Sequence, residues 1–188
     1  MPDGNPIKES LRVALHRHRG LVRVLGRGSY RISPALKEFG TVVLDQGAEG
    51  IVLDMSECVG MDSTFMGVLA GLAVRFKKEQ RSPGAVVLIH LSPKLKRLLG
   101  TLGLDRLVEV HLAGHVPEEL AALSGEGLQK DGVQVNTNAD RSDQMETMLQ
   151  AHEDLVNALP ENMPQFKDVI EFLRQDVRRN SSEAPSPG

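Results

Sequence analysis

The sequence predicts an α/β protein with a mixed β-sheet, helices mainly on one face of the sheet, and a C-terminal α-helical hairpin. Short runs of β-branched residues alternate with segments whose apolar residues recur at helical spacing. The connections are short, which keeps successive elements adjacent and gathers most helices on one face. At 188 residues, with 40% hydrophobic and 25% charged residues, one domain with an appendage is expected.

The first predicted elements are two neighbouring strands, a helix and a buried strand. From Leu11 every second residue is apolar, and a second apolar run follows Gly20. This pattern predicts two strands joined near that glycine. Ser33–Pro34 supply a cap and a first-turn proline for a helix that ends near Gly47. Residues 50–55 are apolar, β-branched and bounded by glycine, so we expect the central strand there.

The next elements complete the predicted sheet. A helix with favourably charged ends is expected from residue 62 to about residue 78. It is followed by a strand over 85–91, a helix that Ser92 caps, and a last strand over 107–112. Residues 118–123 are expected to add one turn or a short helix, which ends the first domain.

The pattern divides the chain into a domain over 9–123, a linker over 124–141, a helical hairpin over 142–179 and a disordered end over 180–188. Glycine, asparagine and other polar residues dominate the linker, although residues 133–135 are able to pair as an edge strand. Apolar residues at 3-4-3 spacing predict the two hairpin helices. The end of the chain has little apolar surface to bury.

Composition and charge exclude several classes of protein. The net charge of −3 is too balanced to attract nucleic acid, and 3% aromatic residues provide few surfaces for base stacking. No apolar run is long enough to span a membrane, and the first residues do not resemble a secretion signal. The single cysteine, Cys58, lies in an apolar run. We expect a cytoplasmic protein without a cofactor.

Motifs for catalysis or ligand binding are incomplete, so we assign no catalytic residue and no metal site. The segment 26–31 begins like a dinucleotide-binding loop, but Arg31 replaces the third glycine, which favours a simple turn. His16 and His18 share a strand face without further ligands, which favours an exposed pair over a metal site. Glu118–Glu119 suit the positive end of a helix dipole.

One group of polar residues remains, where a loop becomes the N-terminus of a helix. Asp62, Ser63 and Thr64 are typical capping residues, because their oxygens accept hydrogen bonds from the free N–H groups there. The same N–H groups and the positive end of the helix dipole would also favour a phosphate on Ser63. The sequence therefore allows a capping role, a phosphorylation site, or both.

These residues and their flanks resemble the STAS domain of bacterial anti-sigma factor antagonists over about residues 9–123. The resemblance rests on the following matches: Asp62-Ser63-Thr64, Gly67, the strand from Ile51 to Met55, Leu91-Ser92-Pro93, Leu98-Leu99 and Gly103-Leu104-Asp105. One departure is Phe65, which stands where the family usually has glycine.

The resemblance implies a non-enzymatic regulatory module. In this family the unphosphorylated domain binds an anti-sigma factor, and this binding frees a sigma factor. The anti-sigma factor is also a kinase that phosphorylates the motif serine, and phosphorylation breaks the complex between the two proteins. The matching phosphoacceptor is Ser63, with Thr64 as a second candidate, and the implied partner-binding residues are Asp62, Ser63, Thr64, Phe65 and Gly67. A serine phosphatase is a further implied partner, and a homodimer is compatible with the pattern.

Two alternatives to this switch stay open. The chain could be a STAS scaffold that is never phosphorylated and holds a signalling assembly through its tail helices. It could also be a nucleotide-binding protein or weak hydrolase, which is disfavoured because no phosphate-binding loop is present. The hairpin itself either packs back on the domain or on itself, or docks into a partner or a second copy.

Overall fold

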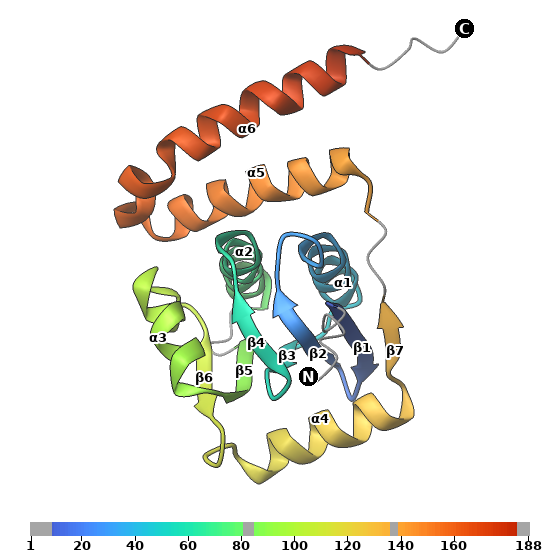
Figure 1. The fold of residues 1–188 in the computed structure, drawn as a ribbon. Helices are drawn as coiled ribbons and strands as arrows, with labels where there is room; N and C mark the ends of the chain where they lie inside the picture. Colours follow the sequence, from blue (N-terminus) through green and yellow to red (C-terminus); the bar gives the residue numbers. More distant parts are fainter. Residues whose placement is uncertain (1–8, 81–84, 136–138, 184–188) are drawn as a thin grey trace, which may run out of the picture.

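The computed structural model describes residues 9–80, 85–135 and 139–183, which form one mixed sheet with six α-helices around it (Figure 1). The strands are β1 (Ser10–His16), β2 (Arg19–Gly28), β3 (Gly50–Asp54), β4 (Cys58–Met61), β5 (Val86–Leu91), β6 (Glu109–Leu112) and β7 (Val133–Val135). The helices are α1 (Ser33–Asp45), α2 (Ser63–Gln80), α3 (Pro93–Thr101), α4 (Glu118–Lys130), α5 (Arg141–Ala158) and α6 (Met163–Glu183), with 3₁₀ turns at Leu104–Arg106 and Pro160–Asn162.

The strand order is β6-β5-β3-β2-β1-β7, and β4 pairs with the end of β2. The strands β2, β3, β5 and β6 run parallel to one another, whereas β1 is antiparallel to both β2 and β7. All five residues of β3 are buried, and Leu53 pairs with Val22 on one side and Leu88 on the other. The predicted mixed sheet with this run as an inner strand is confirmed.

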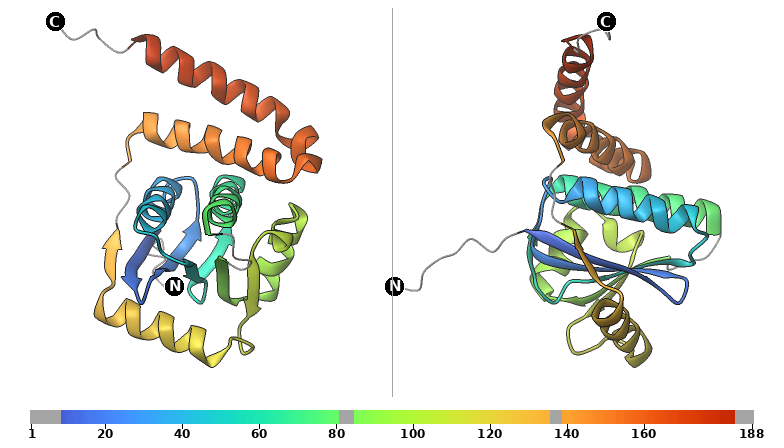
Figure 2. Two further views of the ribbon diagram at one scale, coloured as in Figure 1. Left: turned by 180° about the vertical axis from the view of Figure 1, so that it is seen from behind. Right: turned by 90° about the vertical axis from the view of Figure 1, so that its right-hand side faces the viewer.

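Helices cover both faces of the sheet. On one face α1 and α2 lie side by side, and α5 crosses them on the side away from the sheet (Figures 1 and 2). The large apolar core lies between the sheet and these helices. A smaller cluster lies under α4 on the opposite face, and its fully buried members include Leu21, Val52 and Ile89.

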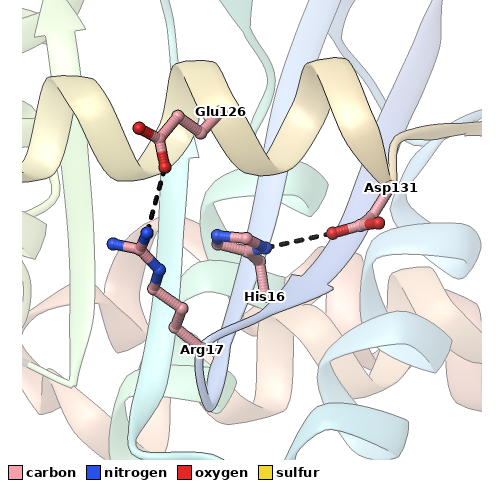
Figure 3. Close-up of polar contacts among 4 residues, drawn as sticks. All are labelled: His16, Arg17, Glu126 and Asp131. Carbon is pink, nitrogen blue, oxygen red and sulfur yellow. Dashed lines mark hydrogen bonds and ion pairs between the residues drawn. The ribbon is translucent and has the colours of Figure 1, made fainter.

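Polar contacts at the β1–β2 turn hold the end of α4 against the sheet (Figure 3). His16 contacts the Asp131 carboxylate at 3.0 Å, and Arg17 donates to Glu126 at 3.2 Å. Gly127 faces the sheet here, because a Cβ at this position would overlap the Leu21 side chain. The two histidines that the sequence analysis places on one strand face thus lie at a turn. His16 is the last residue of β1, and His18 has a positive φ of 61°.

The structure differs from the sequence-based expectation in the segment 124–141. Helix α4 continues to Lys130, and Val133–Val135 form the edge strand β7 against β1. The prediction of a linker was wrong because it took small and polar residues as a sign of a loop. In the structure Ser124 and Gly127 are buried where α4 meets the sheet, and small residues are needed there. Residues 124–130 and 133–135 are therefore parts of a helix and a strand and do not belong to a linker.

Smaller differences concern the ends of elements. The first turn lies at Arg17 and His18, before Gly20. Ser33 is already helical, and its hydroxyl donates to the Ser29 carbonyl at 2.8 Å instead of capping α1. At the C-terminus α6 continues to Glu183, so the disorder expected from residue 180 does not begin there; residues 184–188 lie outside the described chain.

The predicted C-terminal hairpin is present and packs back on the domain. Phe166, Ile170 and Leu173 of α6 are buried and face the hairpin interior, while α5 lies between α6 and the α1–α2 layer. Leu155 and Val156 of α5 and Phe166 and Ile170 of α6 belong to the main apolar core. Packing against this chain's own domain therefore occupies the apolar face of α5.

This packing predicts the effect of removing residues 140–188, a cut placed after β7 so that α4 stays whole. The sheet and its two apolar clusters should still fold, with a lower melting temperature and with newly exposed apolar surface on α1 and α2. Far-UV circular dichroism and binding of an apolar dye would measure both effects against the full chain. A truncated protein without a cooperative unfolding transition would show that the hairpin is part of the folding unit.

Candidate functional site

The site begins at Asp62, which connects β4 to α2 and caps the helix. One carboxylate oxygen of Asp62 accepts from the Phe65 N–H at 2.9 Å, and the other accepts from the Tyr30 N–H at 2.7 Å. The Asp62 N–H donates to the Gly28 carbonyl at 2.9 Å. Asp62 therefore satisfies a free N–H of the helix and also fixes the neighbouring β2–α1 loop.

Ser63 is the first residue of α2, and its hydroxyl is not used for capping. It is half-buried and lies 3.0 Å from Nε2 of His152, a residue of α5. Nδ1 of His152 lies 2.7 Å from the Met148 carbonyl oxygen, which can only accept. Nδ1 therefore carries the proton, Nε2 has the free lone pair, and the Ser63 hydroxyl donates to it.

His152 is buried and neutral at this contact. It is 4% exposed, and its ring centroid is 5.1 Å from that of Phe166 in α6. Burial lowers the pKa of His152, and this effect exceeds the opposing influence of the Met148 carbonyl and the Asp62 carboxylate. The imidazole thus links all three helices, because it contacts Ser63 in α2, lies on α5 and packs on Phe166 of α6.

Thr64 and Phe65 point into the protein. Thr64 is 4% exposed and Phe65 is fully buried, so neither side chain is on the surface. The ring of Phe65 occupies the space beside Gly28, where a Cβ would lie 2.8 Å from the ring. This packing gives Gly28 a structural role, so the glycine-containing segment 26–31 serves the core here. The prediction that Phe65 belongs to a partner-binding surface does not agree with this placement.

The glycines of α2 allow α5 to approach very closely. A Cβ at Gly67 would lie 2.6 Å from the carbonyl carbon of Ala151 and would overlap its oxygen. One turn later, a Cβ at Gly71 would overlap the Asp154 carboxylate. Ser63, Gly67 and Gly71 are spaced four residues apart and therefore form one stripe of α2 that faces α5.

The α2–α5 interface becomes polar beyond Gly67. A cavity of about 240 Å³ lies between α1, α2 and α5, and Lys37, Arg75 and Asp154 contribute charged groups to its lining. Burial raises the pKa of Asp154, although Gln150 donates to its carboxylate at 2.8 Å. The cavity leaves part of this interface unfilled.

Part of the surface next to the motif stays exposed. Tyr30 is 36% exposed, and the Arg31 guanidinium lies 5.8 Å from the centre of its ring. Both belong to the loop whose backbone Asp62 holds. An exposed aromatic ring and a cation are common contacts in protein interfaces. Sequence reasoning treated this segment only as a turn and did not include either side chain in the site.

The other candidates from the sequence have structural surroundings. Glu118 and Glu119 lie in the first turn of α4. Cys58 is buried in β4, and burial raises the pKa of its thiol. Within residues 9–80, 85–135 and 139–183, no cluster of three or more His, Cys, Asp or Glu is placed to hold a metal ion. The helices in the same ranges are too short or too polar to cross a membrane.

Comparisons with known proteins agree with the fold. The family model described as Mlab, STAS domain matches residues 11–109, more than half of the chain, and α5 and α6 lie outside this range. An anti-sigma factor antagonist from Mycobacterium paratuberculosis is 21% identical, with 63% of this chain and 96% of that chain covered and a TM-score of 0.50. Unphosphorylated SpoIIAA is 17% identical, with 62% and 98% covered and a TM-score of 0.46. No curated protein matches the sequence.

His152 is a further site residue that sequence reasoning missed. It lies among the apolar residues whose spacing predicts the first hairpin helix, and it is 89 positions from Ser63 along the chain. The available signal was a histidine among the apolar positions of that stripe, since a buried imidazole needs a polar partner. The sequence pattern does not identify that partner.

The close approach of α5 predicts that Gly67→Ala destabilises the protein by about 1 to 3 kcal/mol, because the added methyl group must push a backbone carbonyl away. The matched control is Gly125→Ala in α4, where the new methyl group meets open space and should stabilise the helix by up to about 1 kcal/mol. Urea denaturation would give both free energies. Equal effects of the two substitutions would contradict the placement of α5.

The lowered pKa of His152 predicts a loss of stability in acid. Because the unfolded chain binds the proton more readily than the folded chain, stability falls as the pH drops below the unfolded value of about 6.5. Denaturation between about pH 7.5 and about pH 5.5 should show a steeper loss for the wild type than for His152→Gln, in which the other histidines still titrate. Parallel pH profiles would mean that His152 is not held neutral.

Proposed function

Because the chain belongs to the STAS domain family, we propose that it is a regulatory binding module of the anti-sigma factor antagonist kind. Its fold is shared with a Mycobacterium paratuberculosis protein of that description. The proposed partner is a serine kinase that also acts as an anti-sigma factor, and a serine phosphatase would reverse its action. In this proposal the chain acts in the cytoplasm of a bacterium, as a ligand of other proteins and not as an enzyme.

The observation that carries the proposal is the position of Ser63. It is the first residue of α2, and Asp62 already provides the cap, so a modification of the Ser63 hydroxyl does not remove the cap of the helix. Thr64, the second candidate, is buried in the core and would need local unfolding to meet a kinase. The geometry therefore favours Ser63 as the acceptor.

The switch follows from the charge of the phosphate. A phosphoserine carries nearly two negative charges, and the helix N-terminus beside it is favourable for an anion. The phosphate would lie next to the Asp62 carboxylate, so the surface changes from weakly to strongly acidic. A partner that buries this surface would have to desolvate the added charge, and without a cation opposite it the complex should dissociate. Asp62, Ser63, Tyr30 and Arg31 are the proposed contact residues.

A scaffold that is never phosphorylated is the second candidate. It is favoured by Val169 and Phe172 of α6, which are exposed, Phe172 by 62%. Exposed apolar side chains of this kind are suited to a protein partner. In that case the partner would bind the hairpin, and the state of Ser63 would be irrelevant.

The proposal predicts one phosphate per chain in cells that carry the cognate kinase. Mass spectrometry of the protein isolated from its native cells should locate the phosphate on the peptide that contains residues 62–67. The modification should disappear in Ser63→Ala and persist in Thr64→Ala. The Ser63→Ala protein should fold normally, with a loss of about 0.5 to 1.5 kcal/mol from the missing hydrogen bond to His152.

Two outcomes would count against this assignment. Phosphate that persists in Ser63→Ala would place the acceptor elsewhere. A wild-type chain that stays unmodified while it is bound to a partner would favour the scaffold, and Phe172→Asp should then abolish partner binding while Ser63→Ala leaves it intact.

A further inference from the structure

We propose that the α5–α6 hairpin is a displaceable cover over Ser63: the docked hairpin blocks phosphorylation, and a phosphate on Ser63 releases the hairpin. The coupling itself is a physical property of this chain, whereas its use as a switch rests on the proposed function. The family match ends at residue 109, so the cover is an addition of this chain to the matched domain.

The docked hairpin leaves no room for a phosphate between Ser63 and α5. The Ser63 hydroxyl is already 3.0 Å from His152 Nε2. The spacing of the two helices at this point is set by backbone contact, because Gly67 lies directly against the Ala151 carbonyl one turn further on. A phosphate group is larger than the hydroxyl it replaces, so the imidazole, and with it α5, must move away.

The surroundings of His152 are also electrostatically unfavourable for a phosphate. His152 is buried against the Phe166 ring and is held neutral, so it offers one donor that the Met148 carbonyl already uses. The Asp62 carboxylate is next to the acceptor in sequence and would repel the new charge. A dianion in this position would lose water without gaining a fixed cation, which is costly. Release of α5 returns the phosphate to water.

The hairpin is built so that it can move as a unit. The buried residues Phe166, Ile170 and Leu173 of α6 pack on α5, and Arg174 of α6 pairs with Glu153 of α5 at 2.7 Å. Polar contacts of the hairpin with the domain include the Ser63–His152 bond, the Asn162 amide on the Leu102 carbonyl at 3.0 Å, and the ion pair of Arg106 with Glu161.

The contact between hairpin and domain combines apolar packing with features that weaken it. Leu155 and Val156 of α5 are buried in the main core, which holds the hairpin down in the unmodified chain. The neighbouring cavity with Lys37, Arg75 and Asp154 leaves part of the interface incompletely packed. An interface of this kind can be opened by a local change at Ser63 while the sheet core stays intact.

Linkage makes the two effects reciprocal. If a phosphate on Ser63 lowers the equilibrium constant for hairpin docking by a given factor, the docked hairpin lowers the equilibrium constant for phosphorylation of Ser63 by the same factor. Partners that need the Ser63 surface therefore bind only chains whose hairpin is undocked. Their apparent affinity equals the intrinsic affinity multiplied by the fraction of such chains. The hairpin thus sets a threshold that a kinase or partner must overcome.

Phosphoserine inserted at position 63 during translation tests the first half of the proposal without any kinase. Hydrogen exchange followed by mass spectrometry should show amides of α5 and α6 exchanging about tenfold faster or more, with β3 and β5 unchanged. The matched control is phosphoserine at position 92, because Ser92 is also a half-buried residue at a helix start. Unchanged exchange in α5 with phosphoserine at position 63 would overturn the proposal.

A thiol at position 63 tests the second half. In a Cys58→Ala background, Ser63→Cys should react slowly with iodoacetamide. Gly71→Leu, which forces α5 away two turns from Ser63, should raise the rate about tenfold or more. The control is Gly125→Leu in α4, where a side chain meets open space. A rate that is the same with and without Gly71→Leu would overturn the covering role.

Failure of the proposal and failure of the proposed function give different results. Neither experiment uses a kinase, so a chain that is never phosphorylated in cells would still show the coupling if the hairpin is a cover. Conversely, phosphate found on Ser63 in cells together with unchanged exchange in α5 would keep the function and remove the cover.

Discussion

The close approach of α5 to α2 is the contact on which the site depends. Gly67 and Gly71 remove the side chains that would separate the two helices, and the Ala151 carbonyl fills the space at Gly67. This approach brings His152 within hydrogen-bonding distance of Ser63 and buries its ring against Phe166. A larger residue in the stripe would move α5 outward and separate the serine from the imidazole.

In the domain beneath the hairpin, Asp62 connects the start of α2 to the β2–α1 loop. Asp62 holds both the first turn of α2 and the backbone of the loop that carries Tyr30. Phe65, which replaces a glycine usual in the family, turns inward and fills the space left by Gly28. The ring is therefore accommodated in the core and does not lie on the surface around Ser63.

Much of the fold could be predicted because its signals are local. The run 50–55 is apolar and β-branched, and Ser92 stands before a proline and caps α3 as expected. The extent of α4 could not be predicted, since its glycines look like a linker until the sheet that they approach is known. Strand β4 lies where the sequence predicts a loop, because its pairing with β2 is not a property of its own four residues.

The candidate site also has a part that the sequence predicts and a part that only the structure shows. A motif of neighbouring residues located Ser63 and the cap, but the burial of Thr64 and Phe65 depends on how α2 is rotated against the sheet. The sequence left open whether the hairpin packs on the domain or on a partner. The choice is settled by Gly67 and Gly71, whose role becomes visible only when α5 is placed beside them.

If the state of Ser63 and the docking of the hairpin depend on each other, a distance within the chain should change when Ser63 is phosphorylated. Spin labels at Val74 of α2 and Phe172 of α6, both exposed, would be compared in chains with serine and with phosphoserine at position 63. We predict one narrow distance distribution for the serine form and a broader, longer one for the phosphorylated form. The same narrow distribution in both forms would show that phosphorylation of Ser63 does not release the hairpin.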